Sequence, residues 1–436
     1  MEWSWQRIPS EYLVTGVKIC RKGKLGQRRG FIHVRRGRIE GLGVGAPKVE
    51  GLPVLDGEGL VCAPGFVDLH VHFREPGHEE KETVATGSRA AAAGGYTSVV
   101  TMPNTDPAID NSGMVRYLID RGREAGLCRI HPTGAVSPGR EGQGMTEFGD
   151  MVSAGAVGFT DDGNPVASGG LMANALKYAD VLGVPIITHA EDRSIVGKGA
   201  MHGGYWSARL GIAGMPRAGE DAAVFRDIEL ARATGGHLHV AHVSTKGAVE
   251  IIRRAKSEGL RVTAEATPHH FSLDHSNCRD YSPLFKMNPP LREPDDLNAV
   301  AEALADGTLD AIATDHAPHT NTEKEHQFDQ APFGVIGLET ALGVGITYLV
   351  NTGIMDLGRL VECMSEAPAR IFNLPCGKLE EGSEADFVLF DPKLQWTVDA
   401  GCFQSLSRNS SYLGETLTGR VVATFRGGRL TWRNED

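Results

Sequence analysis

Short apolar runs alternate with longer Ala- and Leu-rich stretches between about Pro64 and Pro375. Eight of the runs have the length and composition of buried parallel strands, and polar or Gly/Pro-rich residues follow most of them. They cover residues 67–73, 97–104, 128–136, 156–160, 185–190, 238–244, 261–267 and 310–316. Repeated strand and helix units predict an α/β fold with a parallel sheet, and eight such units predict a (β/α)8 TIM-type barrel.

The two ends of the chain follow a different pattern. Residues 11–62 contain short β-type runs separated by turn residues, for example Arg36 and Gly37, and residues 385–430 repeat this style. We therefore predict a small β-sandwich that is assembled from both termini and packs beside the barrel. The expected division is 1–63 for the N-terminal part of the sandwich, 64–375 for the barrel and 376–436 for the C-terminal part.

Composition narrows the classes of partner and location. The 44 Lys and Arg against 55 Asp and Glu give a net charge of −11, so no basic surface for nucleic acid or anionic lipid is expected. No apolar run approaches the roughly 20 residues of a membrane helix, and the first residues lack a secretory signal, so we expect a cytoplasmic protein. The seven cysteines are scattered without a C-x-x-C pair, and we expect them to be reduced and mostly buried.

Histidine and aspartate residues cluster at the ends of the predicted strands. His70 and His72 alternate with apolar residues, so both should point to one face, where two imidazoles can chelate one ion. A pair of hydrogen-bonded interior histidines would give the same spacing. His189, His242 and Asp315 end three further runs, at the edge where barrel active sites are built. The set predicts a metal centre at the barrel mouth.

Two further features of this cluster are left open by spacing. Asp161 and Asp162 both follow the fourth run, and either could supply the carboxylate that bridges two cations. His237 and His239 have the opposite parity from His242 on their predicted strand, so we expect them to be structural.

The motifs that contain these residues resemble the class I dihydroorotases of the amidohydrolase superfamily. The resemblance extends from about Leu60 to Phe333 and is carried by GFVDLHVHFREPG, GGYTSVVTMPNT, TDDGNPV, THAED, HVSTKG, MNPPLR and TDHAPH. It continues in a family-like tail, LPCGKLEEGSEADFVLFD. The resemblance implies a zinc-dependent enzyme that interconverts N-carbamoyl-L-aspartate and L-dihydroorotate in pyrimidine biosynthesis.

The resemblance also implies a set of metal ligands. His70, His72 and Asp315 would hold one zinc, and His189 and His242 would hold a second. Asp162 would bridge them, because residues 156–163 contain no lysine of the kind that is carbamylated in many amidohydrolases. Whether one or two zinc ions are bound stays open. Asp315 is also implied as the catalytic residue, which takes the proton of the attacking water and passes it to the leaving nitrogen.

Arg74 is the residue that gives the most direct indication of the substrate. It has the same parity as His72, and its planar guanidinium suits bidentate binding of a carboxylate, although an arginine after a strand is more often simply solvated. The resemblance places His72 and Arg74 among the substrate-binding residues, together with Asn104, Asn288, His319, Phe333 and Gly334. Asn104 and Asn288 lie beside prolines, where asparagine also commonly shapes turns.

His269 and His270 are expected to be structural, with one of them open to a supporting role behind the metal ligands. The polar segment 319–333 is a candidate lid over the barrel mouth.

Two other functions compete with this interpretation. A hydantoinase or allantoinase would share the metals and the barrel, but such enzymes usually lack an arginine at the position of Arg74. A non-catalytic dihydroorotase-like subunit that supports aspartate carbamoyltransferase would have lost metal ligands, which this chain keeps. A homodimer and a complex with aspartate carbamoyltransferase are the macromolecular partners to consider.

Overall fold

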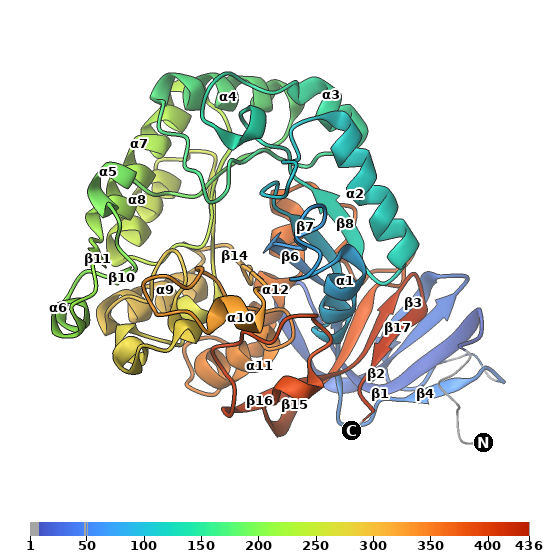
Figure 1. Cartoon of the computed structure of the whole chain (residues 1–436). Helices are drawn as coiled ribbons and strands as arrows, with labels where there is room; N and C mark the ends of the chain where they lie inside the picture. Colours follow the sequence, from blue (N-terminus) through green and yellow to red (C-terminus); the bar gives the residue numbers. More distant parts are fainter. Residues whose placement is uncertain (1–7, 48, 50, 436) are drawn as a thin grey trace.

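The computed structural model describes residues 8–47, 49 and 51–435 of the chain. Within these residues, seven short parallel strands lie at the centre of one part of the molecule, and helices surround them (Figure 1). The strands are β6 (Phe66–Val71), β7 (Tyr96–Thr101), β8 (Arg129–Pro132), β9 (Ile186–Thr188), β12 (Leu238–Val240), β13 (Val262–Ala266) and β14 (Ala311–Ile312). The predicted (β/α)8 barrel is confirmed, with one irregular strand position.

The fourth predicted strand, residues 156–160, is wrong as a regular strand. Phe159 alone forms β-bridges, to Gly134 on one side and Ile186 on the other. Gly158 interrupts the run, and a side chain there would come within 3.2 Å of the Phe372 ring. The backbone at Gly158 therefore packs closely against Phe372 and does not continue the hydrogen bonding of a regular strand. Phe159 still continues the ring from β8 to β9, and a bridge between Val71 and His316 closes it.

The helices of the barrel begin and end at residues suited to helix ends. They are α1 (Val84–Ala93), α2 (Ser112–Ala125), α3 (Phe148–Ala154), α4 (Gly169–Leu182), α5 (Arg193–Val196), α6 (Tyr205–Leu210), α7 (Ala218–Thr234), α8 (Lys246–Ser257), α9 (Pro294–Asp306), α10 (Asn321–Lys324), α11 (Ala341–Gly345), α12 (Leu357–Met364) and α13 (Glu366–Ile371). The Asn111 side chain, for example, accepts a hydrogen bond from Met114 N at the start of α2. That helix ends at Gly126, whose φ of 71° is left-handed, a conformation that glycine adopts without strain.

Helix α8 shows how the sequence pattern places these helices on the barrel. Its buried residues, Ala248, Val249, Ile252 and Ala255, share one face. Arg254 lies on the opposite, exposed face and pairs with Glu258. Burying such a face supplies most of the stability of a surface helix.

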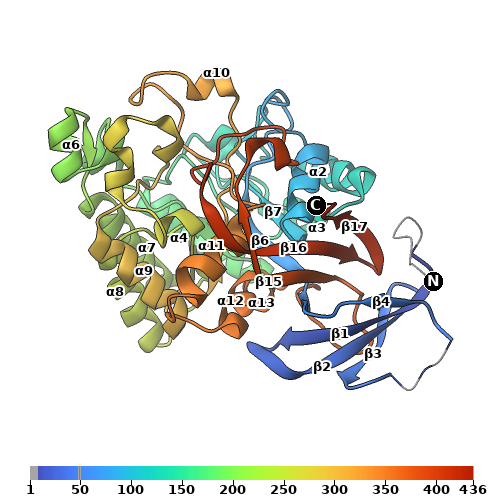
Figure 2. The same ribbon diagram turned by 90° about the horizontal axis from the view of Figure 1, so that it is seen from below.

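Strands from both ends of the chain form one eight-stranded sheet beside the barrel, where blue and red strands lie together in Figure 2. The strands are β1 (Glu11–Arg21), β2 (Lys24–Arg35), β3 (Arg38–Val44), β4 (Val54–Asp56), β5 (Val61–Pro64), β15 (Phe387–Thr397), β16 (Thr416–Arg426) and β17 (Arg429–Arg433). Their order is β17-β16-β15-β5-β1-β2-β3, with β4 paired to β1. The β-domain built from both termini is therefore confirmed, whereas its expected bounds, 1–63 and 376–436, stay a prediction.

The N-terminal and C-terminal strands share one apolar core. Phe387 and Phe425 stack with ring centroids 4.4 Å apart, and Tyr12 lies 6.2 Å from Phe425. Strand β15 also joins the two parts of the molecule, because Phe387 packs in this core whereas its neighbour Val388 packs in the core of the barrel. The termini are thus held against the barrel by alternate residues of one strand.

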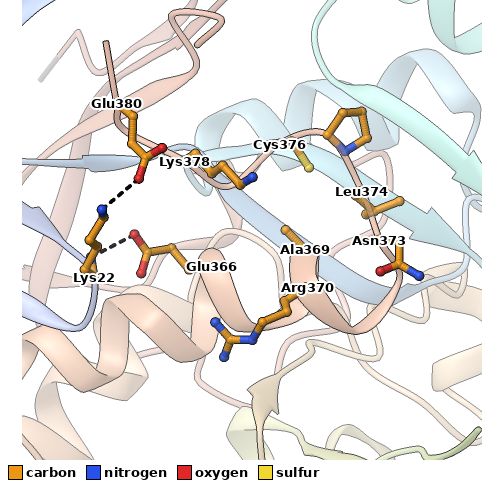
Figure 3. A pocket seen from close by; sticks show the side chains of 10 residues that line it. Lys22, Glu366, Ala369, Arg370, Asn373, Leu374, Cys376, Lys378 and Glu380 are labelled. Carbon is orange, nitrogen blue, oxygen red and sulfur yellow. Dashed lines mark hydrogen bonds and ion pairs between the residues drawn. The ribbon is translucent and has the colours of Figure 1, made fainter. Parts of the chain in front are cut away.

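The largest of the described cavities lies at the amino-terminal end of the barrel strands and not at the histidine cluster. It has a volume of about 580 Å³ and lies between α13 and the loop that follows it, with Lys22 and Glu380 at its edge (Figure 3). Ala369 and Leu374 on its wall pack with Val67 at the start of β6, so they close this end of the barrel. Its charged side chains are partly paired with one another, and none of the predicted site residues lines it.

Two expectations from composition can be compared with the structure. All but Cys402 of the seven cysteines are buried, which confirms the expectation of mostly buried thiols, and their reduced state stays a prediction. Among the described helices, none combines the length and the apolar character needed to span a bilayer.

Candidate active site

The predicted metal-type residues converge at the carboxyl ends of the barrel strands. Strand β6 carries His70 and leads directly into His72, and the others follow β9, β12, β14 and the irregular fourth segment. They are His70, His72, Asp162, His189, His242 and Asp315, and all six are buried. His242 lies beyond the regular strand, because β12 already ends at Val240 and His242 has a φ of 35°. The predicted parity of His237, His239 and His242 along one strand is therefore wrong for His242.

The first group surrounds His70 and His72. His70 Nε2 lies 3.3 Å from Asp162 Oδ1 and 3.7 Å from Asp315 Oδ1. His72 Nε2 lies 3.0 Å from Asp315 Oδ1 and 3.7 Å from Asp162 Oδ2. Both imidazoles therefore point the same ring nitrogen at the same pair of carboxylates.

The second group consists of His189, His242 and Asp162. His189 Nδ1 and His242 Nε2 are 2.9 Å apart, and His242 Nε2 is 3.9 Å from Asp162 Oδ1. Each group offers three ligand atoms within 4.8 Å of one another, and Asp162 belongs to both. Asp161 instead accepts a hydrogen bond from Ser137 N at 3.1 Å, away from the histidines. The structure thus brings Asp162, and not Asp161, between the two groups.

The other ring nitrogens have partners that fix each tautomer. Glu265 Oε1 lies 3.2 Å from His70 Nδ1, and Asn104 Oδ1 lies 2.8 Å from His72 Nδ1. Both oxygens can only accept a hydrogen bond, so each Nδ1 carries a proton. The Nε2 atom is therefore the ring nitrogen that faces the carboxylates in both residues, and His70 Nε2 is buried without a well-formed hydrogen bond. Imidazole nitrogens supported in this way, with carboxylate oxygens opposite, could hold a divalent metal ion in place of a proton.

The charges at the carboxylates and at His189 match the protonation states that metal ligands need, whereas the raised pKa of His70 means that a metal has to displace a proton there. Burial alone would raise the pKa of Asp162, but the charge of His70 and hydrogen bonds from His242 and His70 hold it well below its usual value. Asp315 has a lowered pKa because His72 and His70 likewise outweigh its burial. Burial and His242 lower the pKa of His189 to about 4. The carboxylates are thus ionised and His189 is neutral near pH 7.

The predicted substrate contacts lie around one cavity above this cluster. The cavity has a volume of about 230 Å³. It is lined by His72, Arg74, Asn104, Asp162, Gly163, His189, His242, Asn288, Asp315, Ala317, His319, Phe333 and Gly334. Every predicted site residue except His70 is on this wall, and His70 lies behind it with 1% of its surface exposed.

Arg74 lies on the cavity wall with much of its guanidinium available. Its Nε donates to Pro318 O at 3.1 Å, and none of the carboxylates in the described residues lies within 4.0 Å of it. His319 Nε2 lies 3.4 Å from Arg74 Nη2, but that nitrogen must carry a proton because it donates to Phe333 O at 2.8 Å. The Nη groups of Arg74 are therefore free to bind an anion in the cavity.

The backbone groups of Phe333 and Gly334, which were expected to contact a substrate ring, are partly occupied by protein hydrogen bonds. Phe333 O accepts from His319, and Gly334 N donates to Lys286 O at 2.9 Å. Gly334 has a φ of 113°, and a side chain there would collide with Ala317 at 2.6 Å. Both residues line the cavity, but these two backbone groups already have protein partners.

The two asparagines both act on metal-type residues. Asn104 Nδ2 donates to Asp162 Oδ2 at 3.2 Å while its Oδ1 holds His72. Asn288 Nδ2 donates to Glu191 Oε2 at 2.8 Å and lies 3.3 Å from His189 Nε2.

Sequence reasoning missed two residues that support the site. Glu265 Oε2 accepts from His239 Nε2 at 3.1 Å while Oε1 holds His70, so His239 supports a ligand through this carboxylate. Asn409 Nδ2 donates to Ala317 O and Gly334 O at 3.1 and 3.2 Å, and its Oδ1 accepts from His319 N. A carboxylate inside an apolar strand was a usable signal for Glu265. Nothing in the local sequence marks Asn409.

His269 and His270 have separate environments. His270 is fixed by Thr267 Oγ1 at 2.8 Å and by Pro289 O at 2.9 Å, which makes it a structural support beside Asn288. His269 Nε2 is buried without a hydrogen-bond partner among the described residues. Burial lowers the pKa of His269 to about 4, so the ring is neutral.

The candidate lid is docked over the barrel mouth. Lys324, at the end of α10, is buried and donates to Pro283 O at 3.0 Å and Pro332 O at 2.9 Å. Lys286 Nζ lies 4.5 Å from the centre of the Phe333 ring. These contacts hold segment 319–333 in place, and its movement as a lid stays a prediction.

Comparison with known proteins agrees with this site. The Dihydro-orotase-like family model matches residues 59–248. A dihydroorotase from Pelobacter propionicus is 48% identical over 400 residues, which cover 92% of this chain and 94% of that protein. A dihydroorotase from Anaeromyxobacter dehalogenans (strain 2CP-C) is 49% identical and covers 92% of each chain.

Solved structures with the same fold include a hydantoinase and a dihydropyrimidinase. The L-hydantoinase (dihydropyrimidinase) from Arthrobacter aurescens has a TM-score of 0.86 and 28% identity, and the match covers 97% of this chain and 96% of that one. The dihydropyrimidinase from Brevibacillus agri NCHU1002 has a TM-score of 0.83 at 21% identity over 98% and 96% of the two chains, which shows the shared fold alone. The much higher identity to dihydroorotases, over nearly the full length of both chains, assigns this chain to the dihydroorotase family of amidohydrolases.

Proposed function

We propose that this chain is a dihydroorotase, which reversibly opens the ring of L-dihydroorotate to give N-carbamoyl-L-aspartate in pyrimidine biosynthesis. The observation that carries this proposal is Arg74. It lies beside Asp315 and His72 in one cavity, and no carboxylate of the described residues lies within 4.0 Å of its guanidinium group. In dihydroorotate, the ring amide would face Asp315 and the carboxylate would bind Arg74. Hydantoin, allantoin and dihydrouracil lack that carboxylate.

The cofactor that we propose is zinc, as one or two ions. His70, His72 and Asp315 would hold one ion, His189 and His242 would hold the other, and Asp162 would bridge them. A bound zinc ion lowers the pKa of a coordinated water towards about 7 and polarises a carbonyl oxygen. Because three carboxylates raise the pKa of His70 despite its burial, zinc has to displace a proton there, and its binding should weaken at acid pH.

Asp315 is proposed to move the proton of the reaction. In hydrolysis it accepts a proton from the attacking water as the carbon–oxygen bond forms, and it donates that proton to the ring nitrogen as the carbon–nitrogen bond breaks. Ring closure reverses these transfers. Its lowered pKa keeps Asp315 ionised, and therefore ready as a base, across the neutral range.

The remaining residues bind and orient the substrate. Arg74 would bind the carboxylate, and His319, held neutral by a pKa lowered to about 2 through burial and the nearby Arg74 charge, would add a polar wall without a further charge. Asn104 and Asn288 would keep His72 and His189 in place. Segment 319–333 would cover the bound ring and exclude bulk water.

The test is hydrolysis by the purified chain of L-dihydroorotate, hydantoin and allantoin, each with added zinc and with a chelator. We expect zinc-dependent turnover of dihydroorotate alone. Turnover of hydantoin or allantoin instead would assign the chain to those enzymes, which the shared fold with an L-hydantoinase makes the second candidate. No turnover with zinc bound would favour a scaffold role or a requirement for aspartate carbamoyltransferase, and adding that partner would separate the two.

We propose the cytoplasm as the site of action, where the buried thiols would stay reduced.

A further inference from the structure

A second cluster of potential metal ligands lies outside the active site. His202 in β10 (Met201–His202), His275 at the start of the 3-10 helix η3 (His275–Asp280) and Glu293 before α9 each offer one ligand atom, and the three atoms lie within 4.8 Å of one another. None of the three lines the active-site cavity. The cluster lies between the β10–α6 segment and η3, which pack on each other at the rim of the barrel (Figure 1).

Both imidazoles carry a buried nitrogen that makes no hydrogen bond with the described residues. His202 is 1% exposed and His275 is 7% exposed. His202 Nε2 lies 3.8 Å from Glu293 Oε2, which is too far for a hydrogen bond, and His275 Nδ1 has no hydrogen-bond partner, although the two rings are only 5.4 Å apart. Burying a polar atom without a hydrogen bond is unfavourable, so two such atoms side by side point to a ligand.

A small space between these groups is kept open by a glycine. A side-chain carbon on Gly204 would lie 3.2 Å from His202 Nε2 and 3.3 Å from Glu293 Oε1. Glu293 Oε2 is bound by Arg217 and lies 3.8 Å from His202 Nε2, while Oε1 borders the position of the added carbon. One imidazole nitrogen and one carboxylate oxygen therefore border the place that a methyl group on Gly204 would occupy.

Charges of both signs surround the cluster. Glu293, Asp274 and Asp296 act on His275, whereas Arg292 and Arg217 lie beside His202. Both arginines are already paired with carboxylates, Arg292 with Glu220 and Arg217 with Asp296 and Glu293. A cation at this place would therefore be held by its three ligands and not by an excess of negative charge around them.

We propose that His202, His275 and Glu293 form a second metal site that takes a divalent transition cation of the zinc class. Imidazole donors favour such an ion over magnesium or calcium, and three protein ligands leave one position for water. Ligand atoms around tetrahedral zinc are about 3.4 Å apart, so donors that lie within 4.8 Å of one another have to move closer together to bind one ion. For His202 Nε2 to bind, Nδ1 must carry the proton and Arg292 must give up its 3.3 Å contact there, but Arg292 keeps its bonds to Met215 O and Glu220.

The ion would clamp two segments that lead to the active site. The first follows His189, and the second contains Asn288, between His275 and Glu293. His275 N already donates to Arg292 O at 2.8 Å, so the second segment is a closed loop whose two ends meet at the cluster. The role is structural, because the ligands do not touch the reacting atoms.

Zinc stoichiometry tests this site directly. The wild-type chain is stripped with a chelator, reloaded with zinc, desalted and analysed for zinc per chain by mass spectrometry. The same is done for Gly204→Ala, which keeps all three ligands and fills the gap, and for His275→Asn. Gly204 has a φ of −173°, so alanine fits its backbone without strain. Each variant is expected to hold one equivalent fewer than wild type.

Two controls separate this site from the active centre. His131→Asn removes a partly buried histidine whose buried Nε2 also has no hydrogen-bond partner. His131 belongs to no candidate metal group of the described residues, so this variant should lose no zinc. In an Asp162→Asn chain, which lacks the shared active-site ligand, Gly204→Ala should still remove one equivalent and abolish the rise in melting temperature on adding zinc. Variants that fold and bind as much zinc as their parents would overturn the proposal.

Discussion

His70 and His72 each use one ring nitrogen for a protein partner and present the other to the cluster. Glu265 and Asn104 supply those partners at 3.2 and 2.8 Å. Because these acceptors cannot donate, they select the tautomer that binds a cation. The chemistry of the site is thus decided by residues that the H-x-H spacing does not reveal.

Asp315→Asn tests the proton-transfer role at this scale. The amide keeps the shape of the carboxylate but cannot accept a proton, so kcat should fall by roughly 10³-fold or more. Zinc content and binding of a substrate analogue should largely persist, as measured by mass spectrometry and calorimetry. Near-native turnover would remove Asp315 from the mechanism.

Glu265 should contribute a pH-dependent share of the stability. Burial alone would raise the pKa of Glu265, but hydrogen bonds from His239 and His70 lower it from 4.5 to about 2. Because the unfolded carboxyl binds a proton at higher pH than the folded one, this stabilisation is present above about pH 4.5 and is lost as the pH falls towards 2.

A comparison of the wild-type chain with Glu265→Gln measures this effect. The difference in their free energies of unfolding, from denaturant titrations between pH 7 and pH 3, should shrink by about 2 kcal/mol as the pH falls. A difference that does not change with pH would mean that Glu265 is not ionised in the folded chain.

At the scale of elements, the barrel strands are shorter than the apolar runs that predict them. Strand β12 covers Leu238–Val240 of the run 238–244, and β14 covers Ala311–Ile312 of the run 310–316. The chain then turns through left-handed residues at His242 and Asp315, with φ of 35° and 47°. Strand alternation therefore places His70 and His72 correctly but cannot place the ligands beyond the strand ends.

The segment between β15 and β16 is the element that local patterns leave unassigned. It leaves the terminal β-domain, crosses to the barrel mouth and inserts Asn409, which is 2% exposed. Through Ala317, His319 and Gly334, this one side chain holds two loops of the cavity wall. Only the folded chain brings it there, about 90 residues after His319.

Asn409→Asp should weaken substrate binding more than it slows the chemistry. The new carboxylate faces two carbonyl oxygens to which it cannot donate, a cost of about 1–3 kcal/mol that should displace His319 and Gly334. We expect KM for dihydroorotate to rise roughly 5- to 100-fold, with a smaller change in kcat. Gln404→Ala, an exposed residue of the same segment, is the matched control and should change neither constant. Equal constants for Asn409→Asp and wild type would leave Asn409 without a positioning role.

On the scale of the whole molecule, sequence periodicity predicts the barrel and the β-domain because apolar burial repeats regularly in both. It fails at residues 156–160, where Phe159 alone serves as a strand, since contacts made by neighbouring strands decide that position. The candidate ligands are predictable because metal chemistry needs histidine and aspartate at strand ends. The supports Glu265 and Asn409 are not, because their partners are distant in sequence.

The substrate preference follows from the same architecture. The fold is shared with an L-hydantoinase, so it does not distinguish the two reactions. We propose that Arg74 distinguishes them, because it lies at the same barrel mouth as the candidate ligands and has no carboxylate of the described residues within 4.0 Å.

The role of Arg74 is measured most directly by comparing two substrates, L-dihydroorotate and 5,6-dihydrouracil, which is the same ring without the carboxylate. The ratio of their kcat/KM values is determined for the wild-type chain and for Arg74→Met. The wild-type chain should strongly prefer dihydroorotate, and Arg74→Met should lower the ratio by roughly 10²–10³-fold, mainly through dihydroorotate, as expected for loss of a buried charge pair. A ratio that Arg74→Met leaves unchanged, or a wild-type chain that prefers dihydrouracil, would contradict the assignment of Arg74 and of the substrate.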